Sequence, residues 1–165
     1  MKNIILIGMP ASGKSTVGIV IAKRLGYDFI DSDLLIQSQE KRLLKDIIKE
    51  EGIDGFLKIE NRVNKKIQAC HAVIAPGGSV IYCKEAMEHL KENGIVVYLQ
   101  LSYEIIKNRV KDTKERGVVL REGQNLKMLY DERQVLLEKY ADITICEDGL
   151  SLEQTIEKVL AQIIE

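Results

Sequence analysis

The stretch GMPASGKST, Gly8 to Thr16, directly follows a short apolar run at residues 3–7. Downstream of it, apolar residues recur at helical spacing from Val17 to Leu25, and Gly26 supplies a helix stop signal. The stretch therefore joins a buried strand to an amphipathic helix. This is the context that the pattern G-x-x-x-x-G-K-[ST] requires, and it predicts a phosphate-binding loop.

The residue types of this loop suit a nucleoside triphosphate. Glycines at positions 8 and 13 let successive backbone N–H groups point at phosphate oxygens, and the helix N-terminus adds partial positive charge. We expect Lys14 to reach the β- and γ-phosphates and Ser15 to give its hydroxyl to Mg²⁺. The rest of the predicted nucleotide site consists of Gly8, Ala11, Ser12, Gly13 and Thr16. The loop indicates the phosphoryl donor and leaves the acceptor open.

The remainder of the chain alternates between strand-like and helix-like patterns. Apolar stretches at residues 3–7, 27–30, 72–75, 95–101 and 142–146 predict strands. Between and after them, residues 84–93 and 126–140 predict helices, a capping box at Ser151 opens a last one, and the charged run 41–51 suggests a solvated helix face. Apolar strands alternating with helices predict an α/β fold with a three-layer α/β/α arrangement, about five parallel strands and one domain over residues 1–165.

Composition narrows the classes of protein. The net charge of -1 over 165 residues offers no basic field for nucleic acid, and no apolar stretch approaches the roughly 20 residues that span a bilayer. The three cysteines form no CxxC pair, so we expect them to be reduced. We therefore expect a cytoplasmic protein whose partner is a small molecule, with no nucleic acid and no membrane.

Two acidic residues follow the second predicted strand. Asp31 and Asp33 stand at i and i+2, and in an extended chain they project to the same side. One could hold Mg²⁺ through water while the other orients the attacking hydroxyl or accepts its proton. The alternative is that Asp33 only caps a helix starting at Leu34.

Glycines and arginines elsewhere are further candidates. Gly77 and Gly78 follow the third predicted strand, where adjacent glycines suggest close approach of the backbone to a ligand. The loose, charged segment 112–124 predicts a mobile surface segment near Arg109, Arg116 and Arg121. An arginine on such a segment can close over the nucleotide and meet the charge that develops on the transferred phosphoryl group.

With these residues in view, the whole chain resembles the shikimate kinase family. The likeness runs, in order and at compatible distances, through ILIGMPASGKSTVGIVIAKRLGYDFIDSD, FLKIE, VIAPGGSV, VVYLQL, RGVVL and ERQVLLEKYADITI. It implies a P-loop fold like that of nucleoside monophosphate kinases, with strand order 2-3-1-4-5. It also implies ATP and Mg²⁺ as cofactors, a role in aromatic amino acid biosynthesis and a monomeric enzyme.

The resemblance also implies roles for individual residues. Ser15 and Asp31 would lie near the metal, Asp33 on the acceptor hydroxyls, and Gly77 and Gly78 along the acceptor. The arginines would divide the remaining charges: Arg109 against the adenine, Arg116 on the lid over ATP, and Arg133 on the acceptor's carboxylate. The lid would be residues 112–124 and the acceptor-binding region residues 33–61. The catalytic set would be Lys14, Asp33 and Arg116.

The chain departs from the family pattern at several positions. Ala11 stands where the phosphate loop usually has glycine, a change that is tolerable if its φ is negative. The family's glycine triplet ends here in Ser79, and the lid's Arg-Pro-Leu-Leu is Arg-Gly-Val-Val at residues 116–119. The F-R-x-x-E motif aligns with Phe-Leu-Lys-Ile-Glu at residues 56–60, which puts Leu57 where the second carboxylate-binding arginine belongs.

The loss at position 57 is large enough to affect the acceptor. Removing one partner of a buried charge pair costs about 2 to 5 kcal/mol, or roughly 30- to several thousand-fold in affinity. Lys58 is a poor substitute, because a neighbour on a helix points about 100° away. Glu60 loses its usual partner and could instead accept hydrogen bonds from a hydroxyl- or amine-bearing acceptor.

Three interpretations follow from the sequence. The leading one is an ATP-dependent kinase that phosphorylates shikimate to shikimate 3-phosphate. The second keeps this chemistry but uses another hydroxylated metabolite as the acceptor. The third is a nucleotide-binding protein without acceptor chemistry, which would have little use for Asp33 and Arg116.

Overall fold

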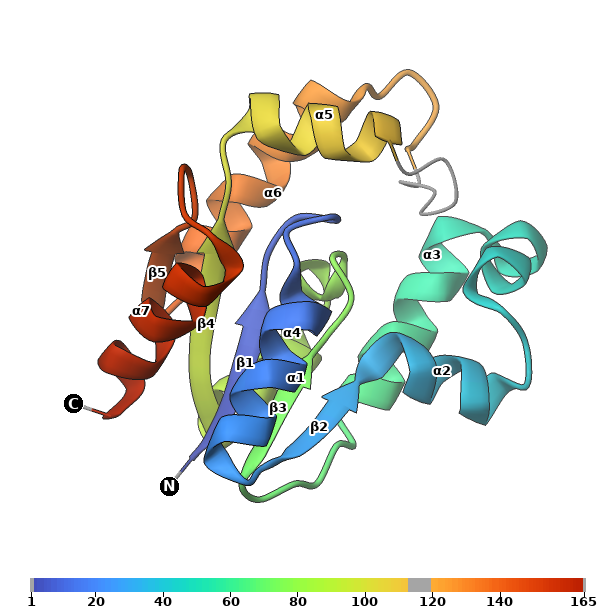
Figure 1. Ribbon diagram of the computed structural model, residues 1–165. Helices are drawn as coiled ribbons and strands as arrows, with labels where there is room; N and C mark the ends of the chain where they lie inside the picture. The colour runs from blue at the N-terminus through green and yellow to red at the C-terminus, as the bar shows by residue number, and fades with distance from the viewer. Residues whose placement is uncertain (1, 113–119, 165) are drawn as a thin grey trace.

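The computed structural model describes residues 2–112 and 120–164 and contains a five-stranded sheet in the order β2-β3-β1-β4-β5 (Figure 1). Every strand pair is parallel, and Ile4 of β1 lies between Val73 of β3 and Ile95 of β4. The strands are β1 (Asn3–Ile7), β2 (Asp28–Asp31), β3 (Ala72–Ala75), β4 (Gly94–Gln100) and β5 (Ile143–Cys146). The predicted fold class and strand order are confirmed.

The predicted helices at residues 17–25, 84–93 and 126–140 and the one opened by Ser151 are confirmed. The helical elements are α1 (Lys14–Leu25), α2 (Ser32–Glu40), α3 (Leu44–Asn64), the 3₁₀ turn η1 (Val80–Tyr82), α4 (Lys84–Asn93), α5 (Tyr103–Asp112), α6 (Leu126–Tyr140) and α7 (Leu152–Ile164). The capping box forms, since Ser151 and Gln154 exchange hydrogen bonds between side chain and backbone N–H. None of the helices described in residues 2–112 and 120–164 is long and apolar enough to cross a membrane.

Each face of the sheet buries its own core. Along β1, Ile4 and Leu6 point to the face that α1 and α7 cover, while Ile5 and Ile7 point to the face that α4 and α6 cover. This alternation is the period-2 geometry of a strand, and burial on both faces explains why β1 is apolar throughout. Gly18 lets α1 approach β2, because a Cβ there would lie 2.7 Å from Cε2 of Phe29.

A third apolar cluster holds α2 and α3 together as an arm, residues 32–64, beside β2. Its members are Ile36, Ile47, Phe56, Ile59 and Val63. Gly52, with a φ of 73° and a ψ of 178°, breaks the helical geometry inside α3. The charged run 41–51 is only partly the predicted helix face, because Lys41 adopts a left-handed conformation that ends α2 and α3 begins at Leu44.

Candidate active site

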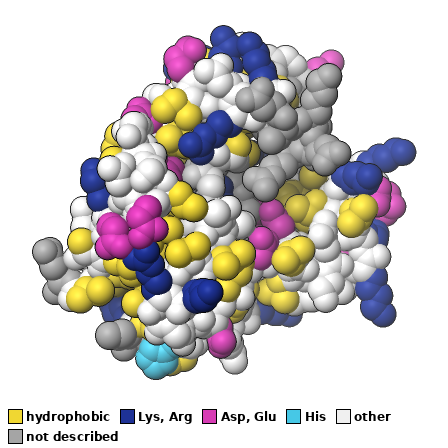
Figure 2. All heavy atoms as spheres, viewed as in Figure 1, with side chains coloured by type: hydrophobic (Ala, Val, Ile, Leu, Met, Phe, Trp, Pro, Cys, Tyr) yellow, Lys and Arg dark blue, Asp and Glu magenta, His cyan; other side chains and the backbone are white. Residues whose placement is uncertain are grey.

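A cavity of about 840 Å³ opens at the carboxyl ends of the strands, between the sheet and the arm. In Figure 2, acidic side chains lie in the hollow beside the arm. The structure brings the following predicted site residues to the cavity wall: Ala11, Gly13, Lys14, Ser15, Thr16, Asp31, Asp33, Leu57, Gly77, Gly78 and Arg133. Ligands in open α/β sheets bind in this crevice. The cavity is large enough for a nucleotide and a small acceptor together.

The phosphate loop wraps the N-terminus of α1. Gly13 precedes the helix with a φ of 86°, a left-handed conformation that favours glycine. The Nζ of Lys14 lies over the loop, 3.0 Å from the carbonyl oxygen of Gly8 and 2.9 Å from that of Met9. Ser12 is buried, and its backbone N–H donates to the carbonyl of Met9. Gly8 and Ser12 pack against each other inside the loop and do not line the cavity.

Ala11 does not have the negative φ on which its tolerance was predicted to depend. Its φ is 66°, in the left-handed region. A Cβ in this region contacts the following carbonyl and costs about 1 to 2 kcal/mol. Its carbonyl oxygen accepts a hydrogen bond of 3.0 Å from Nη1 of Arg109, which anchors the loop in this conformation.

The two aspartates at the end of β2 have separate structural positions. Asp31 ends the strand and caps α2, because its Oδ1 accepts from the backbone N–H groups of Asp33 and Leu34. Its Oδ2 accepts from the hydroxyl of Ser15 at 3.3 Å. A hydroxyl and a carboxylate side by side at a phosphate loop are oxygen ligands of the kind that Mg²⁺ prefers.

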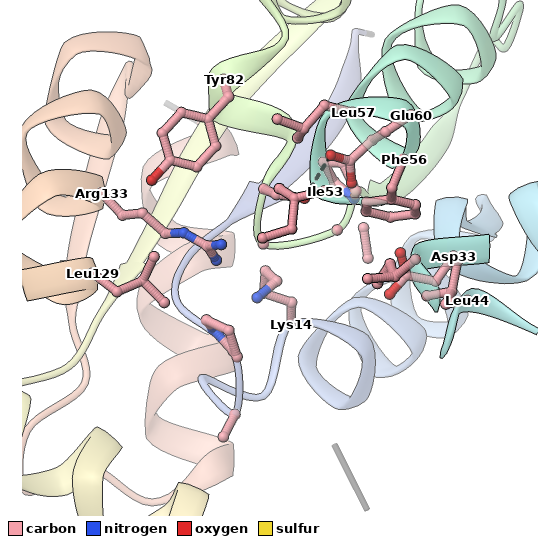
Figure 3. Close-up of a pocket in the computed structure, with 18 of the residues that line it drawn as sticks. Lys14, Asp33, Leu44, Ile53, Phe56, Leu57, Glu60, Tyr82, Leu129 and Arg133 are labelled. Carbon is pink, nitrogen blue, oxygen red and sulfur yellow. Dashed lines mark hydrogen bonds between the residues drawn. The ribbon is translucent and has the colours of Figure 1, made fainter. Parts of the chain in front are cut away.

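The alternative for Asp33, that it caps a helix starting at Leu34, is wrong. Helix α2 begins at Ser32 and Asp31 is its cap, so Asp33 lies in the first helical turn rather than in an extended chain. Its side chain remains available at the cavity wall (Figure 3). Burial and the neighbouring charge of Asp31 raise the pKa of Asp33, while Lys14 opposes them.

Arg133 of α6 brings a buried positive charge to the same cavity. Only 7% of the residue is exposed, and its guanidinium lies 5.5 Å from the centre of the Tyr82 ring. Its Nε has no hydrogen-bond partner, and no carboxylate of residues 2–112 and 120–164 forms an ion pair with it. Buried arginines are ordinarily paired. This guanidinium could therefore form an ion pair with an anionic ligand that enters the cavity.

Adjacent glycines let the backbone pass between the charged side chains. A Cβ on Gly77 would lie 2.6 Å from Oε2 of Glu60 and 2.8 Å from Oδ1 of Asp33. A Cβ on Gly78 would lie 3.1 Å from Nη1 of Arg133. Side chains at these positions would displace the carboxylates and the guanidinium. These contacts are with protein groups, and the close approach of this backbone to a ligand stays a prediction.

Leu57 lies on the cavity wall near Glu60, as Figure 3 shows. Glu60 is fully buried, and its Oε1 accepts a hydrogen bond of 2.6 Å from the hydroxyl of Ser79. The two departures from the family motifs, at positions 57 and 79, therefore meet at one carboxylate. Lys58 is exposed and does not line the cavity.

Some predicted residues lie elsewhere, and some cavity residues were missed. Arg109 contacts the phosphate loop at Ala11 and does not line the cavity, and Arg116 lies outside the described residues, as does most of the predicted lid. Tyr82 was missed, since a lone tyrosine carries no signal for a site. The apolar part of the wall was also missed, because isolated apolar residues in helical segments carry no signal for a site: Leu43, Leu44, Ile48, Ile53, Phe56 and Leu129.

Comparison with known proteins decides the family. The family model described as shikimate kinase matches residues 10–164. The chain belongs to the shikimate kinase family. The members of this family are phosphotransferases that use a hydroxyl acceptor, and ATP is their phosphate donor.

Shikimate kinases from several bacteria are similar over the full chain. The protein from Thermodesulfovibrio yellowstonii is 36% identical, with 98% of this chain and 95% of the relative covered. The protein from Persephonella marina is 34% identical, with 99% of each chain covered. The solved structure of shikimate kinase from Acinetobacter baumannii in complex with shikimate is 32% identical, covers 99% of this chain and 93% of that chain, and superposes with a TM-score of 0.88.

Proposed function

We propose that this chain transfers the γ-phosphoryl group of ATP to a hydroxyl of shikimate, giving shikimate 3-phosphate. The observation that carries the proposal is the buried guanidinium of Arg133, which forms no ion pair within the described part of the chain and shares one cavity with Lys14 and Asp33. Arg133 can bind a carboxylate of the acceptor, Asp33 can bind its hydroxyl, and the phosphate loop can bind the donor. These groups together match an acceptor that bears both an acid group and hydroxyls.

The catalytic roles follow from these positions. Asp33 orients the attacking hydroxyl and accepts its proton, and Lys14 stabilises charge on the transferred phosphoryl group. Mg²⁺ would be held by Ser15 and Asp31, and when bound it supplies charge that offsets the phosphates. Arg116 would meet the transferring group from the lid, residues 112–124, and Arg109 would pack against the adenine. Most of the rate enhancement then comes from positioning and electrostatics.

The second candidate is a kinase of the same mechanism with another hydroxylated acceptor. It is favoured by one observation, that Leu57 offers an apolar side chain to the acceptor wall in place of a second arginine. A coupled assay of ADP formation across shikimate, gluconate, sugars, hydroxy-amino acids and nucleosides separates the two. Saturation by shikimate at micromolar concentration supports the first candidate. Turnover of another acceptor with none of shikimate supports the second.

We further propose that the enzyme acts in the cytoplasm as a monomer. Support comes from the cavity, whose donor and acceptor walls both come from one chain, and from the three cysteines, which are free. Residues 33–61 would form the acceptor-binding region of a single domain spanning residues 1–165. Light scattering during turnover tests the monomer, since a dimer as the active species would contradict it.

A further inference from the structure

The carboxyl group of Glu60 is buried without a charged partner. Two protein groups hold one of its oxygens: the hydroxyl of Ser79 donates to Oε1 at 2.6 Å, and the thiol of Cys83 lies 3.8 Å from the same atom. The other oxygen, Oε2, has no hydrogen-bond partner within the described part of the chain. A buried carboxylate without a partner is costly, so a proton can bind there with little penalty.

Four groups surround Glu60 from the elements packed against α3. Asp33 of α2 and Arg133 of α6 influence it by charge, while Ser79 and Cys83, on either side of η1, contact it directly. Burial and the charge of Asp33 raise the pKa of Glu60 to about 7, against the opposing effects of Ser79 and Arg133. Burial also raises the pKa of Cys83 to about 12, so its thiol stays neutral near neutral pH.

Around the turn at Gly77 and Gly78, the described residues bring one guanidinium, that of Arg133, close to two carboxyl groups, those of Asp33 and Glu60. Arg121 also lines the cavity, but it forms an ion pair with Asp54. Gly77 packs against Glu60 and Gly78 against Arg133, so the two charged groups flank the same turn of backbone. Leu57 supplies no second cation. When the acceptor's anionic group arrives at Arg133, the negative charge of Glu60 opposes it unless Glu60 is protonated.

We propose that Glu60 is a specificity-determining residue for the acceptor: held by Ser79 beneath Gly77, it competes with the acceptor's anionic group for Arg133, so that the anion binds together with a proton from solvent. The proton converts the carboxylate of Glu60 to the neutral acid. This inference rests on the proposed function, because it concerns how the same site takes a carboxylate-bearing acceptor.

The inference predicts a pH dependence that is specific to the acceptor. Below neutral pH, Glu60 carries the proton and the KM for shikimate is at its lowest. As the pH rises above neutrality the proton must be taken up on binding, and the KM rises by up to about tenfold per pH unit. The KM for ATP should not follow this slope, because Glu60 is held by Ser79 and Cys83 and not by the phosphate loop.

The experiment measures kcat and the KM values for shikimate and ATP between pH 5.5 and pH 9. Glu60→Gln, which is neutral at every pH, should flatten the pH profile of the KM for shikimate. The matched control is Glu147→Gln, a second buried carboxyl group with a pKa raised to about 7 by burial but outside the cavity wall. This control should keep the slope of the parent.

Two further variants keep the test decisive if Glu60→Gln folds poorly. Ser79→Ala removes a donor that favours the charged form, so the rise in KM should begin at a higher pH. Leu57→Arg supplies a second cation, which should flatten the profile. The same pH profile of the KM for shikimate, in slope and in onset, in the parent and in all three variants would contradict the inference while leaving the proposed function intact. Absence of shikimate turnover at every pH would contradict both.

Discussion

The proposed ATP side and the proposed acceptor side of the cavity are built from different parts of the chain. On the donor side, nine consecutive residues, 8–16, form a backbone loop at the N-terminus of α1. On the acceptor side, Asp33, Leu57, Gly77 and Arg133 come from four separate segments and offer mainly side chains. A backbone loop tolerates changes of side chain, whereas the acceptor side changes its charge when one residue changes. The two departures at Leu57 and Ser79 both lie outside the phosphate loop, so we expect them to affect the choice of acceptor more than the binding of ATP.

The largest expected effect separates chemistry from donor binding. Asp33→Asn removes the group that orients the hydroxyl and accepts its proton, so we expect kcat to fall by about 10²- to 10⁴-fold with the affinity for ATP nearly unchanged. Calorimetric titration of ATP and a coupled assay measure the two quantities. Asp46→Asn on the same arm is the control. Full turnover in Asp33→Asn would show that the acceptor-side base is another group.

The next effect concerns the acceptor alone. Arg133→Gln removes the buried guanidinium, so we expect the KM for shikimate to rise by roughly 30- to several thousand-fold, while the KM for ATP changes little. Steady-state kinetics measure both, with Arg24→Gln, in the last turn of α1, as the control. An unchanged KM for shikimate would mean that the carboxylate binds elsewhere.

Adding a positive charge at position 57 should strengthen the binding of the acceptor. Leu57→Arg places a second cation beside Glu60, and a charge-assisted hydrogen bond is worth about 1.5 to 3 kcal/mol. We expect the KM for shikimate at pH 8 to fall by about tenfold or more. Leu57→Met, which keeps the volume without the charge, should leave it near the parent value. A rise in KM with arginine would indicate that the cavity has been shaped for another acceptor.

A stability measurement probes the donor side. Burial raises the pKa of Glu147 to about 7, with Arg109 and Lys14 opposing the shift. A carboxyl group whose pKa is raised on folding contributes stability below its unfolded value and loses it as the pH rises through the folded value. Glu147→Gln should therefore gain about 1 to 3 kcal/mol over the parent at pH 8 and little at pH 5, as measured by urea unfolding. Equal differences at both pH values would contradict this.

The smallest effect tests backbone strain in the phosphate loop. Ala11→Gly relieves a left-handed alanine but gives the unfolded chain more freedom, so we expect a gain of up to about 1 kcal/mol in the free energy of unfolding. Ala22→Gly, a buried position inside α1, should lose stability instead. A lower free energy of unfolding in Ala11→Gly than in the parent would contradict the strain argument.

Much of the fold was predictable because its signals are local. The strand of residues 3–7, the helices at 84–93 and 126–140 and the capping box at Ser151 each depend on neighbours within a few positions. The corrections that the structure brings depend on backbone conformation: Ala11 lacks the negative φ that was its condition, Asp33 lies in a helical turn and not in an extended chain, and the run 41–51 is broken at Lys41. A left-handed residue is set by the loop that surrounds it, and its own side chain does not disclose it.

By itself, the sequence determined the phosphate loop, the parallel sheet and the family pattern with its missing arginine, because these depend on the spacing of residues close together in the chain. Only the tertiary structure decided that Leu57, Ser79 and Glu60 lie close together, that Arg133 is buried without an ion pair among the described residues, and that Gly77 lies against two carboxyl groups. The physical reason is that burial and the partners of a charge are properties of elements packed together. Residues 57, 79 and 133 acquire their electrostatic relation only when α3, the turn after β3 and α6 close around one cavity.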